Sequence, residues 1–132
     1  MTLRTPTGDE IERFRVGPAD RFIGRARIYS VSEGLGTGET LVRAVYFDAG
    51  ARARPHLHSR DQVLFFVERG MVALDGGPDQ PVGAGRYVLL PAGVPHMHGA
   101  ADGEPAVHIS IMSEIDSDFN CPIPQEWNHF RA

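Results

Sequence analysis

Short apolar stretches separated by turn-forming residues run along most of the chain, and this pattern predicts strands rather than helices. Segments that alternate apolar and polar residues, or are rich in β-branched and aromatic residues, are separated by Gly, Pro and Asp clusters such as Asp75–Asp79. The expected strands are residues 21–30, 41–47, a buried pair over 62–74 that turns near Gly70, 85–90, 96–99 and 106–112. Many short strands with regular turns are typical of an antiparallel sandwich or barrel, so we predict an all-β fold.

The two ends of the chain carry weaker signals. Residues 1–20 are polar and contain Gly and Pro, which predicts a loose arm or one edge strand, and residues 34–38 are a glycine-rich turn or loop. In the tail, residues 113–132, only the segment 125–130 suggests a short helix, and we expect Trp127 and Phe130 to dock onto a groove or a partner subunit. We therefore expect one domain over residues 1–132, with its core at 41–112.

Composition excludes several classes of function. A net charge of −4 argues against partners that need a basic surface, such as nucleic acid or an anionic membrane. The lone Cys121 cannot form an intrachain disulfide, and neither a leader nor a long apolar run is visible. The expected protein is cytoplasmic, and its expected partner is a small molecule.

Three histidines and one amide have the spacing of a metal site on extended segments. His56 and His58 are two residues apart, so on one strand they point to the same side. Gln62 begins the next apolar run and can bring a carbonyl oxygen to the same centre, while His96 completes the set from distant sequence. Three nitrogens and one neutral oxygen leave one or two positions open, which is typical of a catalytic metal rather than a structural one.

The ligand set limits the metal without identifying it. Imidazole suits several divalent metals, and a neutral oxygen does not choose among them, so Fe, Ni, Zn, Cu and Mn all remain candidates. Because Gln62 cannot act as a base, the base must come from another residue. The candidates are His98, which on a regular strand faces the same side as His96, and His108, whose facing is undecided.

Apolar residues near these segments are the candidates for the substrate pocket. On their strand, Leu64 and Phe66 share the side of Gln62 and are expected to line the cavity. Phe47 and Leu89 are further candidates. An apolar lining favours an aromatic or polyketide-like substrate over a free sugar.

At these residues the chain resembles the cupin superfamily. The residues that match the two family motifs are Gly50, His56, His58, Gly85, Pro91, Gly93 and His96. Gln62 stands where the family usually has Glu, Ala100 replaces the usual Asn, and the spacing from Gln62 to Gly70 is one residue longer than usual. Over residues 41–112 the resemblance implies a jelly-roll barrel with a metal inside one end, commonly in a homodimer.

Several functions are compatible with such a site. The first is a metal-dependent oxygenase that acts on a chelating diketone, catechol or polyketide-like substrate. Next to it stands a redox-neutral isomerase, cyclase or lyase, in which the metal polarises a carbonyl and a histidine moves the proton. The third is a non-catalytic ligand-binding module. The sequence favours the oxygenase by a narrow margin, because O₂ chemistry is frequent in the superfamily, although the neutral Gln62 favours the redox-neutral alternative.

Overall fold

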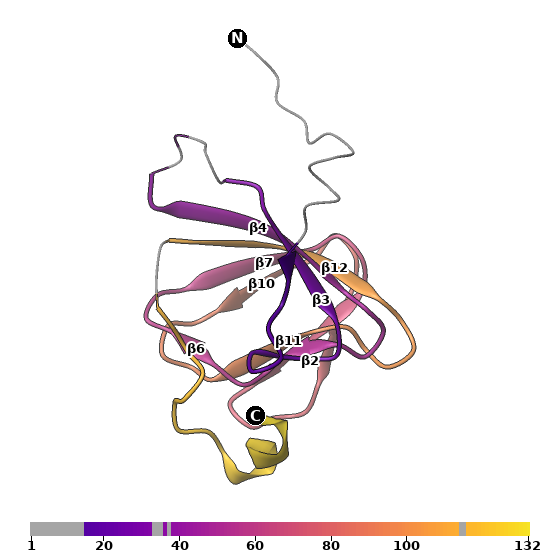
Figure 1. Cartoon of the computed structure of the whole chain (residues 1–132), viewed down its shortest axis with the longest axis vertical. Helices are drawn as coiled ribbons and strands as arrows, with labels where there is room; N and C mark the ends of the chain where they lie inside the picture. The colour runs from indigo at the N-terminus through magenta and orange to yellow at the C-terminus, as the bar shows by residue number, and fades with distance from the viewer. Residues whose placement is uncertain (1–14, 33–35, 37, 114–115) are drawn as a thin grey trace.

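The computed structural model describes residues 15–32, 36, 38–113 and 116–132. Most of its strands form two antiparallel sheets that lie one above the other (Figure 1), and two short strands, β6 (Leu57–His58) and β13 (Ser117–Asp118), form a separate pair. The six-stranded sheet has the order β1 (Arg15–Val16), β3 (Ala26–Ser30), β4 (Thr40–Phe47), β12 (Ala106–Ser113), β7 (Gln62–Phe66), β10 (Tyr87–Leu90). The five-stranded sheet has the order β2 (Phe22–Ile23), β5 (Arg52–Ala53), β11 (His96–Gly99), β8 (Gly70–Leu74), β9 (Gln80–Val82). The predicted all-β fold is confirmed as a jelly roll whose sheets do not close.

The long strands β4 and β12 form the centre of the six-stranded sheet. They are paired along their whole length, from Ala106 opposite Phe47 to Ser113 opposite Thr40. Burial alternates along most of β12, and on β4 the adjacent Ala44 and Val45 are both buried, so the side chains of β12 divide most clearly between the interior and the outer side. This alternation decides which side chains reach the interior.

The segment 21–30, expected as one strand, is two strands in different sheets. Gly24 lies between β2 and β3 with a φ of 73°, a left-handed conformation that other residues rarely adopt. A Cβ there would also lie 2.9 Å from the Cβ of Ala51. The glycine therefore lets the chain cross from one sheet to the other, which the residue pattern alone did not indicate.

The segment 62–74, expected as a buried strand pair, also divides between the sheets. β7 lies between β12 and β10, whereas β8 lies between β11 and β9, so the two strands do not pair with each other. Gly70 is the first residue of β8, and glycine is needed there because a Cβ would lie 2.6 Å from the carbonyl oxygen of Gly99. The strand β9 was not expected, since Pro81 and the preceding turn hide it in the sequence.

The C-terminal tail packs on the chain's own sheet. Residues Gln125–Phe130 form a 3₁₀ helix, η1, which agrees with the predicted short helix. It places Trp127 against Ala73 and Met97, and the indole Nε1 donates a hydrogen bond to the carbonyl oxygen of Gly77 (3.2 Å). His96 and His98 face inward, so Met97 between them and the docked Trp127 lie on the outer side of the five-stranded sheet.

Other predictions about the chain ends are only partly covered by the described residues. Residues 1–14 of the expected arm, and 33–35 and 37 of the glycine-rich loop, lie outside them. The described end of the arm forms β1, the edge strand that was one of the two alternatives. Within the described segments, no helix has the length and apolar character needed to cross a membrane.

Candidate metal centre and cavity

Three buried histidines converge from separate parts of the fold. His58 lies on β6 (Leu57–His58), His56 immediately precedes that strand, and His96 begins β11. The backbones of His56 and His96 form an antiparallel bridge, with hydrogen bonds of 3.2 and 2.8 Å. The potential ligand atoms of the three side chains all lie within 4.8 Å of one another. The cluster can hold a metal ion, as the spacing of the histidines predicted.

The far side of each imidazole is held by an oxygen atom. Nδ1 of His56 donates to the carbonyl oxygen of Arg54 at 2.7 Å, and Nδ1 of His96 donates to that of Val94 at 3.0 Å. Because a carbonyl oxygen only accepts, these contacts leave Nε2 of both rings unprotonated. Nε2 of His96 is buried and has no hydrogen-bond partner among the described residues. A buried, unsatisfied lone pair is costly, and a metal ion would satisfy it.

Gln62 presents its oxygen to the same cluster. Its Oε1 lies 3.1 Å from Nε2 of His58, while its Nε2 donates to Oγ of Ser110 at 2.8 Å. Two donors that bind one metal at right angles lie roughly 3 Å apart, so this separation suits a shared ion. Nδ1 of His58 lies 3.2 Å from Oγ of Ser117, a hydroxyl oxygen that can accept a hydrogen bond from Nδ1–H when Nε2 binds a metal.

Burial keeps these histidines in the form that binds metals. It lowers the pKa of His96 to about 4, and it holds the pKa of His56 well below the usual 6.5. The pKa of His58 is also lowered, again mainly by burial. Neutral imidazole is the metal-binding form, so the residues fit a divalent metal without a preceding proton loss near neutral pH.

A second pair of histidines lies beside the cluster. Nε2 of His108 is 3.0 Å from Nδ1 of His98, and the ring of His98 lies 5.4 Å from that of His56. Burial lowers the pKa of His108 to about 3; burial and then the nearby His108 hold the pKa of His98 well below its usual value. Two neutral rings share one N–H···N bond, so the pair can accept a proton at its open nitrogens. The structure therefore brings both predicted acid–base candidates beside the cluster of three histidines.

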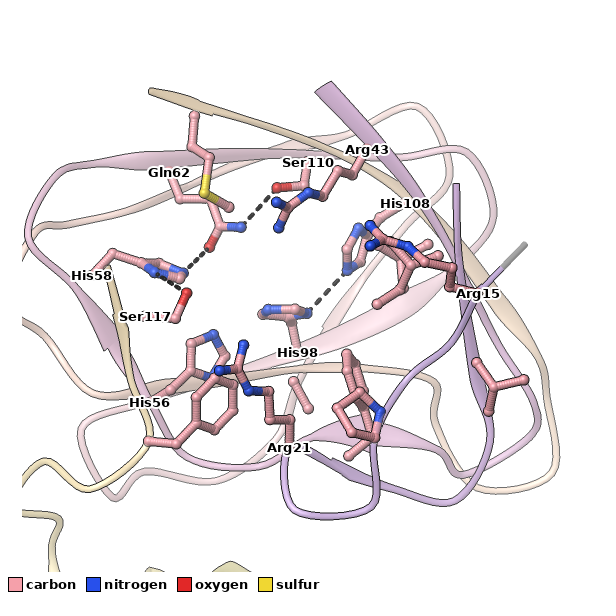
Figure 2. Close-up of a pocket in the computed structure, with 18 residues that line it drawn as sticks. Arg15, Arg21, Arg43, His56, His58, Gln62, His98, His108, Ser110 and Ser117 are labelled. Carbon is pink, nitrogen blue, oxygen red and sulfur yellow. Dashed lines mark hydrogen bonds between the residues drawn. The ribbon is translucent and has the colours of Figure 1, made fainter. Parts of the chain in front are cut away.

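These groups open into a cavity of about 320 Å³ between the sheets (Figure 2). Its polar walls are His56, His58, Gln62, His98, His108, Ser110, Ser117 and three arginines, Arg15, Arg21 and Arg43. Its apolar walls include Phe22, Ile28, Val45, Met112 and Phe119. The side chain of Phe119 stacks on His56, with ring centroids 4.5 Å apart and planes 14° apart. No Asp or Glu lines the cavity among the residues that the structure describes.

The four apolar pocket residues proposed from the sequence do not line this cavity. The prediction for Leu89 is wrong, because its side chain is 57% exposed on the outer side of β10, whereas that of its neighbour Leu90 is buried. Leu64 and Phe66 face inward but lie deeper, in a core cluster with Val72 and Leu90. Phe66 and Phe47 contact the ring of His108, with centroids 5.4 and 5.1 Å away. These two rings form a support behind the histidine pair.

Sequence reasoning missed the polar residues that surround the cavity. Arg43 could have been found, because it is the one charged residue on the β4 side shared by Val45 and Phe47. Ser110 likewise follows His108 by two residues on β12 and faces the same way. Ser117 and Phe119 belong to the tail, where β13 (Ser117–Asp118) pairs with β6, and no local pattern signals this contact.

Comparison with known families and curated proteins gives consistent matches. Residues 44–112 match the family described as the cupin domain. The chain is 31% identical over 101 residues to an (R)-mandelonitrile lyase of Granulicella tundricola, an alignment that covers 76% of this chain and 77% of that protein.

Solved structures agree with the fold. A cupin-like protein from Thermotoga maritima is 28% identical, with a TM-score of 0.74 over 88% of this chain and 92% of that one. The polyketide cyclase RemF from Streptomyces resistomycificus also has a TM-score of 0.74, over 96% of this chain and 89% of that one. RemF is only 15% identical, so this likeness concerns the fold alone.

Proposed function

The chain belongs to the cupin family, and on this premise we propose that it is a metal-dependent lyase. The proposed substrate is a small molecule whose reacting carbon bears a hydroxyl or carbonyl oxygen. The observation that carries the proposal is the hydrogen-bonded pair of His98 and His108 beside a cluster of neutral metal-binding donors. The similarity to an (R)-mandelonitrile lyase over three quarters of the chain supports the same class of reaction.

In this proposal, the metal is held by His56, His58, His96 and Gln62. A divalent ion bound there would act as a Lewis acid on the reacting oxygen. Because the oxygen donor of Gln62 is neutral, the site keeps the full charge of the ion and polarises that oxygen strongly. Iron, nickel, zinc, copper and manganese all remain candidates for this position.

The histidine pair moves the proton. For a hydroxynitrile, the pair takes the proton of the hydroxyl group, the carbon–carbon bond to the nitrile breaks, and its electron pair leaves with cyanide. The aldehyde carbonyl forms from the former hydroxyl oxygen, and the pair returns the proton to cyanide as hydrogen cyanide. Burial lowers the pKa of both His98 and His108, so both rings are neutral near pH 7 and carry a free ring nitrogen at the start.

The oxygenase, narrowly favoured from the sequence, remains the alternative. The neutral Gln62 and the paired histidines favour proton transfer over O₂ chemistry, and isomerase or cyclase reactions would use the same groups. A non-catalytic binding module would not require a proton-transfer pair beside the metal. A homodimer and a cytoplasmic location stay predictions.

The test is turnover of mandelonitrile by protein of known metal content. We expect one metal per chain and faster formation of benzaldehyde from one enantiomer of mandelonitrile than from the other. His56→Ala, which should lose the metal, gives the background of spontaneous decomposition. Oxygen uptake with diketones or catechols would instead establish the oxygenase. Metal binding with no turnover of any hydroxynitrile or carbonyl substrate would contradict the lyase.

A further inference from the structure

We propose that the cavity contains an anion subsite centred on Arg43, and that the natural substrate is an organic acid whose carboxylate binds there. This inference rests on the proposed function for the position of the reacting oxygen at the histidine cluster. It adds to the proposed function that the substrate carries a carboxylate.

Arg43 extends into the cavity close to the proposed metal position. It lies on β4 directly opposite Ser110, the residue whose hydroxyl accepts the hydrogen bond from Gln62. Figure 2 shows its guanidinium beside Ser110, on the same wall as Gln62 and His108. A group bound to Arg43 is therefore a near neighbour of the oxygen bound at the cluster.

Among the described residues, no acidic side chain neutralises this cation. Within residues 15–32, 36, 38–113 and 116–132, Arg43 has no ion pair, and its Nε is buried without a hydrogen-bond partner. The half-buried position lowers the pKa of Arg43, first through loss of solvation and then through the charges of Arg15 and Arg21. An unpaired charge in such a place is costly for the fold, and a bound anion would offset this cost.

A second arginine of the same chain shows the opposite arrangement. The guanidinium of Arg52 forms two hydrogen bonds to the carboxylate of Asp79, at 3.0 and 2.7 Å. That residue is buried and fully paired, as a structural arginine is expected to be. Arg43 has the same fork of donors but presents it to the cavity.

Two further arginines make the cavity mouth positive. The guanidinium of Arg21 lies 5.1 Å from the centroid of Phe119, whose ring stacks on His56. Arg15 lines the cavity from the edge strand β1. The chain as a whole has a net charge of −4, whereas three arginines and no acidic residue among the described ones line this cavity. Such a field attracts small anions and orients them as they enter.

The chemistry of the subsite selects a carboxylate. A guanidinium binds a carboxylate through two parallel hydrogen bonds, which also define its orientation. A neutral molecule such as mandelonitrile would leave Arg43 unpaired in the occupied cavity. The better substrate therefore has a carboxylate on the carbon skeleton that carries the reacting hydroxyl or carbonyl oxygen.

The test compares two ligands that differ in charge. Mandelate and mandelamide have the same ring and hydroxyl group, and isothermal titration calorimetry on the metal-loaded protein gives their dissociation constants. In wild type we expect mandelate to bind at least about tenfold more tightly than mandelamide. Arg43→Gln should remove most of this preference and leave mandelamide binding within about twofold, whereas Arg43→Lys should retain part of it. The control Arg86→Gln removes one exposed charge outside the cavity and should change neither ligand.

The outcomes separate the anion subsite from the proposed reaction. Equal loss of both ligands in Arg43→Gln, or no loss of mandelate binding, would overturn the subsite, and the latter would assign the preference for anions to the metal. If mandelate binding depends on Arg43 while no hydroxynitrile is cleaved, the subsite stands and the lyase proposal fails. If a hydroxynitrile is cleaved but mandelate binding does not depend on Arg43, the lyase proposal stands and the subsite fails.

Discussion

Nε2 of His108 lies 3.0 Å from Nδ1 of His98, and this hydrogen bond joins the two sheets across the interior. His108 belongs to β12 of the six-stranded sheet, and His98 belongs to β11 of the five-stranded sheet. Phe47 and Phe66 contact the ring of His108 from behind, so its position is held by packing. The pair is thus oriented by the tertiary structure toward the histidine cluster.

Loss of either member of this pair should reduce turnover while the metal remains bound. In His98→Gln or His108→Gln we expect the rate constant to fall by about a hundredfold or more, because proton transfer loses its acceptor. Metal content by elemental analysis should stay at the wild-type level. The exposed His129→Gln serves as control. A wild-type rate in both cavity variants would make the pair part of the wall only.

Removal of a metal-binding residue should instead release the metal, and activity should be lost with it. His96→Ala should lose the metal and all activity while the circular dichroism spectrum keeps its strand signature. Ser110→Ala should keep the fold and lower metal affinity by about 10–100-fold, because Ser110 orients the amide of Gln62. Ser113→Ala, on the same strand, is the matched control. Full metal occupancy in His96→Ala would refute the assignment.

The stability of the metal-free protein should fall as the solution becomes acidic. His108 has a folded pKa of about 3, and an unfolded histidine has a pKa of about 6.5. Between about pH 6.5 and about pH 3, His108 is protonated in the unfolded chain but stays neutral in the folded chain. Unfolding therefore becomes more favourable as the pH falls through this range. Urea denaturation between about pH 7 and 5 should show this loss, and the loss should be smaller in His108→Phe. An equal pH dependence in both proteins would contradict the burial of a neutral ring.

The docked tail should stabilise the fold without taking part in metal binding. Trp127 is only 2% exposed, so Trp127→Ala should lower the free energy of unfolding by about 3–5 kcal/mol through the cavity it leaves. Tyr87→Ala removes a ring that is 72% exposed, and it should change stability by about 0.5 kcal/mol or less. Chemical denaturation measures both. A loss of metal together with Trp127 would show that the tail also supports the site.

The residue pattern was sufficient for the relations within a strand. Alternation placed His56 with His58 and His96 with His98, and the spacing of the histidines predicted the metal cluster. It also placed Leu64 and Phe66 on the side of Gln62. These inferences hold because the facing of side chains on a strand depends only on a local period of two residues.

Relations between strands needed the tertiary structure. Leu89 and Leu90 are equally apolar, and only the pairing of β10 with β7 turns Leu89 outward and Leu90 inward. An inward-facing residue can line the cavity or pack in the core beneath it, depending on its position along the strand. On β7, Gln62 lines the cavity, whereas Leu64 packs in the core. The sequence by itself therefore determined the cupin fold and its histidine cluster. The three arginines and the ring of Phe119 that give the cavity its charge and shape come together only through long-range packing. The alternation of residues along one strand does not indicate which distant segments will contact each other.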